Sequence, residues 1–117
     1  ITFVCRGTSL ARVVGELHFA HNIRVNVRER LIYSRLPAVI DWYGYVIWRG
    51  SGKLFWYDPQ PHPNEPGLQS THPHHKHVSP DIKHNRVPAP NMSFTQPNLP
   101  EIIQEIERMI SNIEGKS

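Results

Sequence analysis

The sequence predicts an α+β fold, in which an antiparallel β meander of about four strands is covered by a C-terminal helix. Apolar and polar residues alternate between residues 12 and 58, which is the period of half-buried strands. The period disappears between Pro59 and Pro100, a stretch that holds ten of the eleven prolines. Near the C-terminus it becomes helical. A chain of 117 residues is expected to form a single domain, here residues 1–117.

The strand predictions rest on a two-residue period and on short connections. Ile23, Val25 and Val27 alternate with polar residues, so one face of this segment is expected to be buried. The connections "AHN", "SRLP" and "GSG" are short enough for antiparallel neighbours, and glycine takes a positive φ without strain. The predicted strands are residues 12–19, 22–32, 39–49 and 53–58.

Residues 59–97 are predicted to form a long loop rich in proline and histidine. Proline lacks the amide donor that a central strand or a helix interior needs. A loop of this length inside a domain is either functional or disordered. Its histidines favour a functional role.

Residues 98–114 are predicted to form the C-terminal helix. Asn98 is expected to cap its first turn, and Glu101 completes a capping-box pattern. The helix is expected to pack on the inner face of the sheet, because its isoleucines share one stripe. The stripe consists of Leu99, Ile102, Ile103, Ile106, Ile110 and Ile113.

Charge and cysteine content limit the class of protein. The formal net charge is +3, and the basic excess lies before residue 98, which suits a partner that carries phosphate. One cysteine, Cys5, excludes an internal disulfide and a thiolate metal cluster and favours a reducing cytoplasm. No apolar run reaches membrane-spanning length, and no signal peptide is recognisable. We therefore expect a soluble cytoplasmic protein.

The motif "HPHHKH", residues 72–77, has two chemical interpretations. As a zinc site it offers His72, His74 and His77, because alternate residues of an extended segment share a side. The familiar zinc-ligand spacings are absent, however, and Pro73 stiffens the segment. We therefore predict no metal cofactor, with zinc at these three histidines as the alternative.

The second interpretation is an acid-base site that cleaves RNA. Attack by the 2′-hydroxyl needs a base, an acid and cations that offset charge on the phosphate. Histidine serves as either proton carrier near neutral pH, and Lys76 supplies a cation. The simpler alternative is that several of these histidines face solvent.

Basic residues on the strands offer a surface for such a substrate. Arg24, Arg28 and Arg30 share one face of their strand by the two-residue period, and Arg49 and Lys53 flank the "GSG" turn. An ordinary charged outer face would have the same composition. The strand aromatics alternate between the two faces, so some belong to the core and others are available to stack on bases. The predicted substrate contacts are Arg24, Arg28, Arg49, Lys53, Lys83 and Arg86.

Two segments resemble a known family. "YDPQPHP" precedes "HPHHKH", and "PDI", "APNMSF" and an Ile-rich helix follow. Over residues 14–113 the chain resembles the TumE-like toxins of bacterial and archaeal toxin–antitoxin modules. The chain departs from the family pattern at Trp56 and Pro59, where members often have Arg and Asn. The positions that match the family's motifs are Asp58, His62, His72, His75, Lys76 and His77.

The resemblance implies a RelE-like toxin that arrests growth as a ribosome- or RNA-directed endoribonuclease, of the mRNA interferase kind. It also implies a small DNA-binding antitoxin as partner. The predicted roles are His75 or His77 as base and His62 or His72 as acid. Lys76 and Arg49 are predicted to stabilise the transition state.

A second class of function stays open, namely an interaction module whose histidine segment binds zinc or docks a partner. Self-association is also left open. Both classes of function predict that the loop folds back towards Asp58 at the end of its strand. We expect His62 and at least one histidine of residues 72–77 to approach this carboxylate, because aspartate orients an imidazole and fixes its tautomer.

Overall fold

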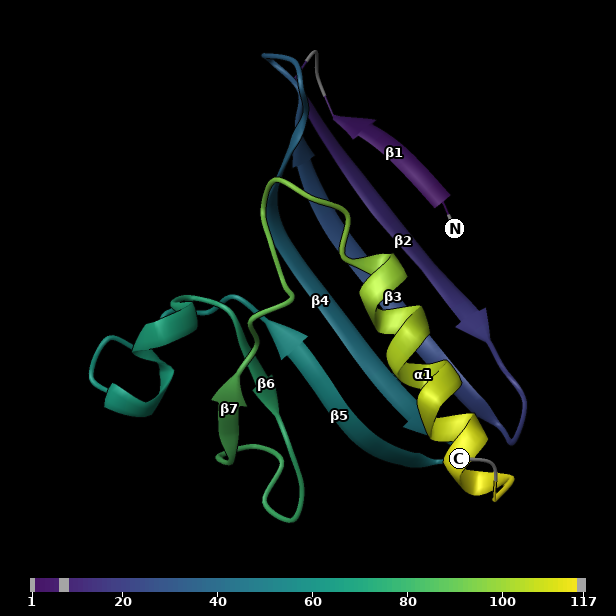
Figure 1. Cartoon of the computed structure of the whole chain (residues 1–117). Coiled ribbons are helices and arrows are strands. Elements are labelled where there is room, and N and C mark those ends of the chain that lie inside the picture. The colour runs from purple at the N-terminus through teal and green to yellow at the C-terminus, as the bar shows by residue number, and fades with distance from the viewer. Residues whose placement is uncertain (1, 7–8, 116–117) are drawn as a thin grey trace.

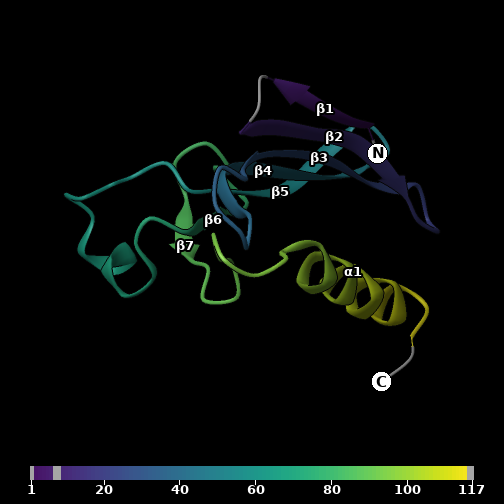
Figure 2. The same cartoon turned by 90° about the horizontal axis from the view of Figure 1, so that it is seen from above.

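The structure, a computed structural model, describes residues 2–6 and 9–115. It has one antiparallel sheet with its strands in chain order, covered on one face by a C-terminal helix (Figures 1 and 2). The predicted α+β class and the antiparallel meander are confirmed. The strands are β1 (Thr2–Arg6), β2 (Leu10–His18), β3 (Ile23–Ile32), β4 (Val39–Arg49), β5 (Gly52–Asp58), β6 (His75–His77) and β7 (Arg86–Pro88). The helices are the short 3-10 helix η1 (Pro66–Thr71) and α1 (Leu99–Ile113).

The four predicted strands correspond to β2, β3, β4 and β5; β4 has the predicted ends, and the ends of the others differ by at most two residues. Two tight turns use positive φ angles. His21 and Asn22 have φ values of 62° and 60°, and Gly50 has 59°. Two successive positive φ angles match the right-handed twist of the paired strands. The short connections therefore form hairpins as predicted.

The strand count is the part of the prediction that was too low, because the described part of the sheet has seven strands. β6 and β7 lie within residues 59–97, which the sequence predicts as loop. Proline excludes only its own position from a sheet interior, and β6 reads "HKH". Pro88 lies on β7, the last strand of the sheet, where a missing donor costs no ladder bond on the outer side.

The core lies between α1 and the sheet, as the isoleucine stripe predicts. Ile102 and Ile106 are buried in one cluster with Tyr43, Tyr45 and Ile47. Figure 1 shows α1 lying over β3 and β4, and Figure 2 shows it on one side of the sheet. Among the described residues, no helix has the length and apolar character needed to cross a lipid bilayer.

The predicted capping box is wrong. The side chain of Asn98 makes no bond to the first helical amides. Its Oδ1 accepts the amide of Ser93 at 2.8 Å, and its Nδ2 donates to the hydroxyl of Tyr45 at 3.1 Å. The backbone carbonyl of Asn98 accepts the amides of Glu101 and Ile102 instead. Full burial explains the difference, since a buried amide must satisfy both ends within the protein.

The other face of the sheet is covered by no helix in the part of the chain that the structure describes (Figure 2). Alternation sends the residues between the core positions to this side. Cations pack on indoles there: Arg24 lies 4.7 Å from the Trp48 ring and Lys53 4.7 Å from the Trp56 ring. We call this surface the open face. Its members used below are Arg12, Arg24, Arg28, Arg30, Trp42, Trp48, Lys53, Trp56, Asp58, His75, His77 and Arg86.

Candidate functional site

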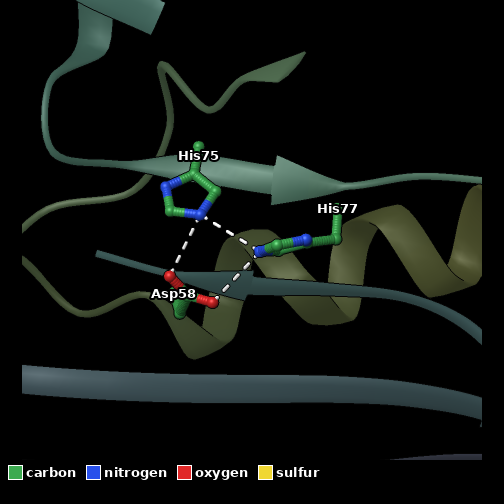
Figure 3. Close-up of side chains that lie close together, drawn as sticks. All are labelled: Asp58, His75 and His77. Atoms are coloured by element: carbon green, nitrogen blue, oxygen red, sulfur yellow. Dashed lines mark hydrogen bonds and ion pairs between the residues drawn. The ribbon is translucent and has the colours of Figure 1, made fainter. Parts of the chain in front are cut away.

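Three side chains converge where β5 and β6 pair. Asp58 is opposite His75 in the ladder, and His77 is two residues further along β6, so all three share the open face. His75 Nε2 is 3.0 Å from Asp58 Oδ1, and His77 Nε2 is 3.2 Å from Oδ2. The two Nε2 atoms are 3.1 Å apart. Figure 3 shows these contacts, and we call the group the triad.

The second ring nitrogen of each histidine is held by the backbone. His75 Nδ1 lies 3.1 Å from the carbonyl oxygen of Pro73, and His77 Nδ1 lies 3.0 Å from that of Ile82. A carbonyl oxygen only accepts, so each Nδ1 must donate. In a neutral imidazole the proton is then on Nδ1 and the lone pair is on Nε2. Both lone pairs and the carboxylate therefore face one another.

The carboxylate of Asp58 is also fixed by its own donors. Trp56 Nε1 donates to Oδ2 at 3.0 Å, and the amide of Gln60 donates to Oδ1 at 2.9 Å. Burial alone would raise the pKa of Asp58, but the hydrogen bonds from His75, Gln60 and Trp56 outweigh it and hold that pKa well below its usual range. Asp58 is therefore ionised, although it is half-buried at the end of β5.

The two histidines differ in charge preference. Burial lowers the pKa of His75, but its bonds to Asp58 and to the Pro73 carbonyl raise it above the ordinary value. For His77, burial prevails and the pKa is lowered. In the protein alone, one proton shared between the Nε2 atoms and the carboxylate accounts for the short distances.

Other rings enclose the triad. Trp56 stacks on His77 at 4.0 Å between centroids, and the His62 ring lies 4.8 Å from that of His75. Burial, and then the charge of Arg86, lower the pKa of His62. The expected return of the loop to Asp58 is confirmed, because His75 and His77 contact it and His62 lies beside them.

Arg86 is the cation nearest the triad. It is opposite His77 in the β6–β7 ladder, and its Nη1 donates to Glu65 Oε1 at 2.7 Å. Its Nε is buried and has no hydrogen-bond partner among the described residues. This predicted substrate residue therefore lies at the site, with one donor unused.

Lys76 does not join the histidines, although the sequence groups them. Alternation sends it to the opposite side of β6. There Nζ donates to Glu105 Oε2 of α1 at 2.7 Å and lies 4.2 Å from the Phe55 ring. Its contacts connect the sheet edge to the helix.

His72 and His74 also lie away from the triad. His72 is exposed, and the Nδ1 of His74 is 2.5 Å from the hydroxyl of Tyr43. The ring of His74 also packs on Phe94. His72, His74 and His77 are therefore not assembled as a zinc site. Among the described residues, the group whose ligand atoms all lie within 4.8 Å is Asp58, His75 and His77.

The predicted substrate cations are spread along the sheet. Arg28 is opposite Gly44 and therefore near the Asp58 end of the strands. Arg24, Arg49 and Lys53 lie towards the β4–β5 hairpin, at the other end. Lys83 is exposed between β6 and β7. Of the six predicted contacts, Arg28 and Arg86 are the two near the triad.

Two neighbouring cavities line the open face. One, of about 290 Å³, is lined by Arg28, Trp42, Gly44 and Asp58 among others. The other, of about 340 Å³, is lined by Arg12, Arg28 and Trp42 among others. Because they share Arg28 and Trp42, they lie side by side, and the first reaches Asp58; we call the two together the groove.

Sequence reasoning missed how Trp42, Gly44 and Arg12 contribute to this groove. The Trp42 ring lies over Gly44, since a Cβ built there would be 2.9 Å from the ring. The two-residue period places Trp42 and Arg28 on one face, but only the register puts them next to each other. That register pairs Arg28 with Gly44.

The family model described as "Toxin TumE" matches residues 1–110. The chain belongs to the TumE toxin family. This confirms the resemblance seen in the sequence, and a TumE toxin implies a cognate antitoxin as partner. No curated protein and no solved structure matches the chain.

Proposed function

We propose that this TumE toxin arrests growth as a RelE-like endoribonuclease that acts on single-stranded RNA, free or on the ribosome, and that a small DNA-binding antitoxin holds it in check. The observation that carries the proposal is the groove on the open face. It combines cations and an exposed indole, and it ends at Asp58, the carboxylate of the triad. Single-stranded nucleic acid is bound in this way, with phosphates on cations and bases on aromatic rings.

Two arginines of the groove are available for phosphates. Arg12 and Arg28 have no ion pair with any described residue, whereas Arg24 pairs with Glu16 at 3.3 Å and Arg30 pairs with Asp41. An unpaired guanidinium keeps its full charge for a ligand. Arg12 and Arg28 are therefore the phosphate contacts. They lie diagonally on neighbouring strands, because Arg12 is opposite Arg30.

Trp42 is the base-stacking residue. Its side chain is 39% exposed, unusually high for so large a ring on a strand. In the register Trp42 is opposite Arg30, as Arg12 is from the other side, and it lines both cavities together with Arg28. A base on this ring would place the adjoining phosphodiester towards Asp58.

The cleavage step is transesterification within the RNA. The 2′-oxygen bonds to phosphorus, the bond from phosphorus to the 5′-oxygen breaks, and a 2′,3′-cyclic phosphate forms. The triad accepts the proton of the 2′-hydroxyl. His62, the histidine of the group with the more exposed ring at 19%, donates a proton to the 5′-oxygen from its protonated form, which the bound phosphate would favour against the burial and the Arg86 charge that lower its pKa. Arg86 offsets the charge on the phosphate, the role that the sequence assigns to Lys76 and Arg49.

The test uses purified toxin, end-labelled single-stranded RNA and translating ribosomes. Wild type is expected to leave 2′,3′-cyclic phosphate ends, and Arg28→Gln to weaken RNA binding and lower its salt dependence by about one phosphate contact. Arg24→Gln is the matched control, because it removes a paired arginine from the same strand and face. Absence of cleavage on every substrate, with Arg28→Gln and Arg24→Gln binding alike, would favour the interaction-module function.

A further inference from the structure

We propose that Asp58, His75 and His77 bind one first-row divalent transition-metal ion, such as zinc. This ligand set differs from the one that the sequence offers as a zinc alternative. Two histidines and one carboxylate are the protein ligands of several catalytic zinc and iron sites, which leave other positions open to water or substrate.

The distances have the size that such a site requires. Ligands bound at about 2.1 Å from a metal lie about 3.0 Å from one another in octahedral geometry and about 3.4 Å in tetrahedral geometry. The facing atoms of the triad are 3.0 Å apart for His75 Nε2 and Asp58 Oδ1, 3.1 Å for the two Nε2 atoms, and 3.2 Å for His77 Nε2 and Asp58 Oδ2. One central ion would therefore need little movement of these side chains.

The hydrogen bonds around the triad orient the ligand atoms. Metal-bound histidine usually donates its other N–H to a carbonyl or carboxylate, which fixes the tautomer. His75 and His77 both do so, towards Pro73 and Ile82. Asp58 receives the indole N–H of Trp56 as well. Each ligand is held with its lone pair pointing inward.

Charge and access also suit a cation. Arg86 would oppose a positive ion, but Glu65 pairs with it at 2.7 Å. Counting Asp58 and Glu65 against Arg86 leaves one net negative charge when the imidazoles are neutral. The cavity lined by Asp58 on the open face offers a route from solvent.

The burial of His75 and His77 is the strongest argument against the alternative that these histidines face solvent and bind nothing. The side chains of His75 and His77 are 1% and 6% exposed, and that of Asp58 is 18% exposed. Placing three polar groups at one buried point is costly unless each is satisfied. A metal ion would coordinate all three groups at once, whereas a single proton must be shared among them.

The bound ion would carry a water molecule whose pKa lies near neutrality. In the proposed function, an ion held by Asp58, His75 and His77 would supply the base for the 2′-hydroxyl proton. Metal binding itself does not rest on that function, so the two ideas fail separately. The sequence favours a metal-free route because it shows no familiar ligand spacing. A ligand set drawn from two strands has no such spacing.

The test is titration of chelator-treated full-length protein with zinc, cobalt and manganese, each alone, followed by calorimetry and elemental analysis. One ion per chain is expected for wild type. Asp58→Asn and His77→Gln are expected to bind more than about 100-fold more weakly, beyond the loss typical of an outer hydrogen-bond partner. His72→Gln and His84→Gln are the matched controls, because both residues are exposed, and they should bind as wild type does.

Two measurements keep the outcome decisive. Circular dichroism of the metal-free variants checks that they fold, and the visible spectrum of the cobalt form of wild type reports nitrogen and oxygen ligands without a thiolate charge-transfer band. Cys5→Ser should leave that spectrum unchanged. Absence of binding at metal concentrations on the order of 1 mM, binding that survives in both triad variants, or a spectrum that depends on Cys5 would overturn the proposal. Metal binding without RNA cleavage would sustain it and reject the proposed function alone.

Discussion

Replacing Gly44 by alanine is expected to displace Trp42 from the RNA groove while leaving the fold intact. The new Cβ would lie 2.9 Å from one ring atom of Trp42 and 3.4 Å from the next, closer than carbon atoms approach without repulsion. The ring is 39% exposed and is free to swing outward. The backbone of Gly44 has no positive φ, so alanine fits it, and stability should change by less than about 1 kcal/mol.

The effect on RNA should be much larger. Stacking of one base on an aromatic ring contributes about 1–3 kcal/mol, which corresponds to about 5- to 150-fold in affinity. Fluorescence anisotropy with a short labelled RNA measures this loss, and thermal unfolding measures stability. Trp42→Ala should lose a similar amount. Gly67→Ala is the matched control, because a Cβ there meets nothing within 4 Å. RNA affinity equal to wild type in both Gly44→Ala and Trp42→Ala would refute the reasoning.

Three further outcomes are expected. Ile106→Ala should lower the free energy of unfolding in urea by about 2–5 kcal/mol, because Ile106 is fully buried against the sheet. Ile113→Ala, at the exposed end of the helix, is the control and should change it little. Equal losses in the two variants would contradict the assignment of Ile106 to the core. Lys76→Met should cost about 1 kcal/mol through its bond to Glu105 and leave RNA cleavage by the folded fraction unchanged; loss of cleavage without loss of stability would restore its predicted catalytic role. With chelator present, acidification should lower the free energy of unfolding through Asp58, because a carboxyl whose pKa is lowered in the folded state stabilises the fold above its unfolded pKa of about 4 and loses this contribution as the pH falls below that value. Urea unfolding of Asp58→Asn should lack this part of the pH dependence. Identical pH profiles for wild type and Asp58→Asn would contradict the prediction.

Much of the fold was predictable because its signals are local. The alternation around Ile23, Val25 and Val27 and the isoleucine stripe of α1 each report burial within one segment. The predicted capping role of Asn98 was wrong because its side chain makes other hydrogen bonds, to the hydroxyl of Tyr45 and to the backbone of Ser93. Local patterns cannot show which distant groups compete for one side chain.

The site was predictable in its members more than in its arrangement. His62 and at least one histidine of residues 72–77 were expected to approach Asp58, and the structure places His75 and His77 in contact with it and His62 beside them. The separation of Lys76 from its neighbours follows from strand alternation, but only once residues 75–77 are known to be a strand. Proline on both sides concealed that strand, since propensity averaged over the segment favours a loop.

β6 serves the fold on one side and the site on the other, and this constrains how the gene can change. The segment of residues 59–74 can lengthen or shorten, provided that the chain returns in the same register and that His62, Glu65 and the Pro73 carbonyl keep their contacts. One residue inserted within β6 would turn the imidazoles of His75 and His77 to the helix side of the sheet. It would turn Lys76, which pairs with Glu105, to the open face. We therefore expect related toxins to vary in length before residue 75 and to keep the three-residue spacing of the strand. Length variation inside the strand, with toxicity retained, would show that another segment supplies the site.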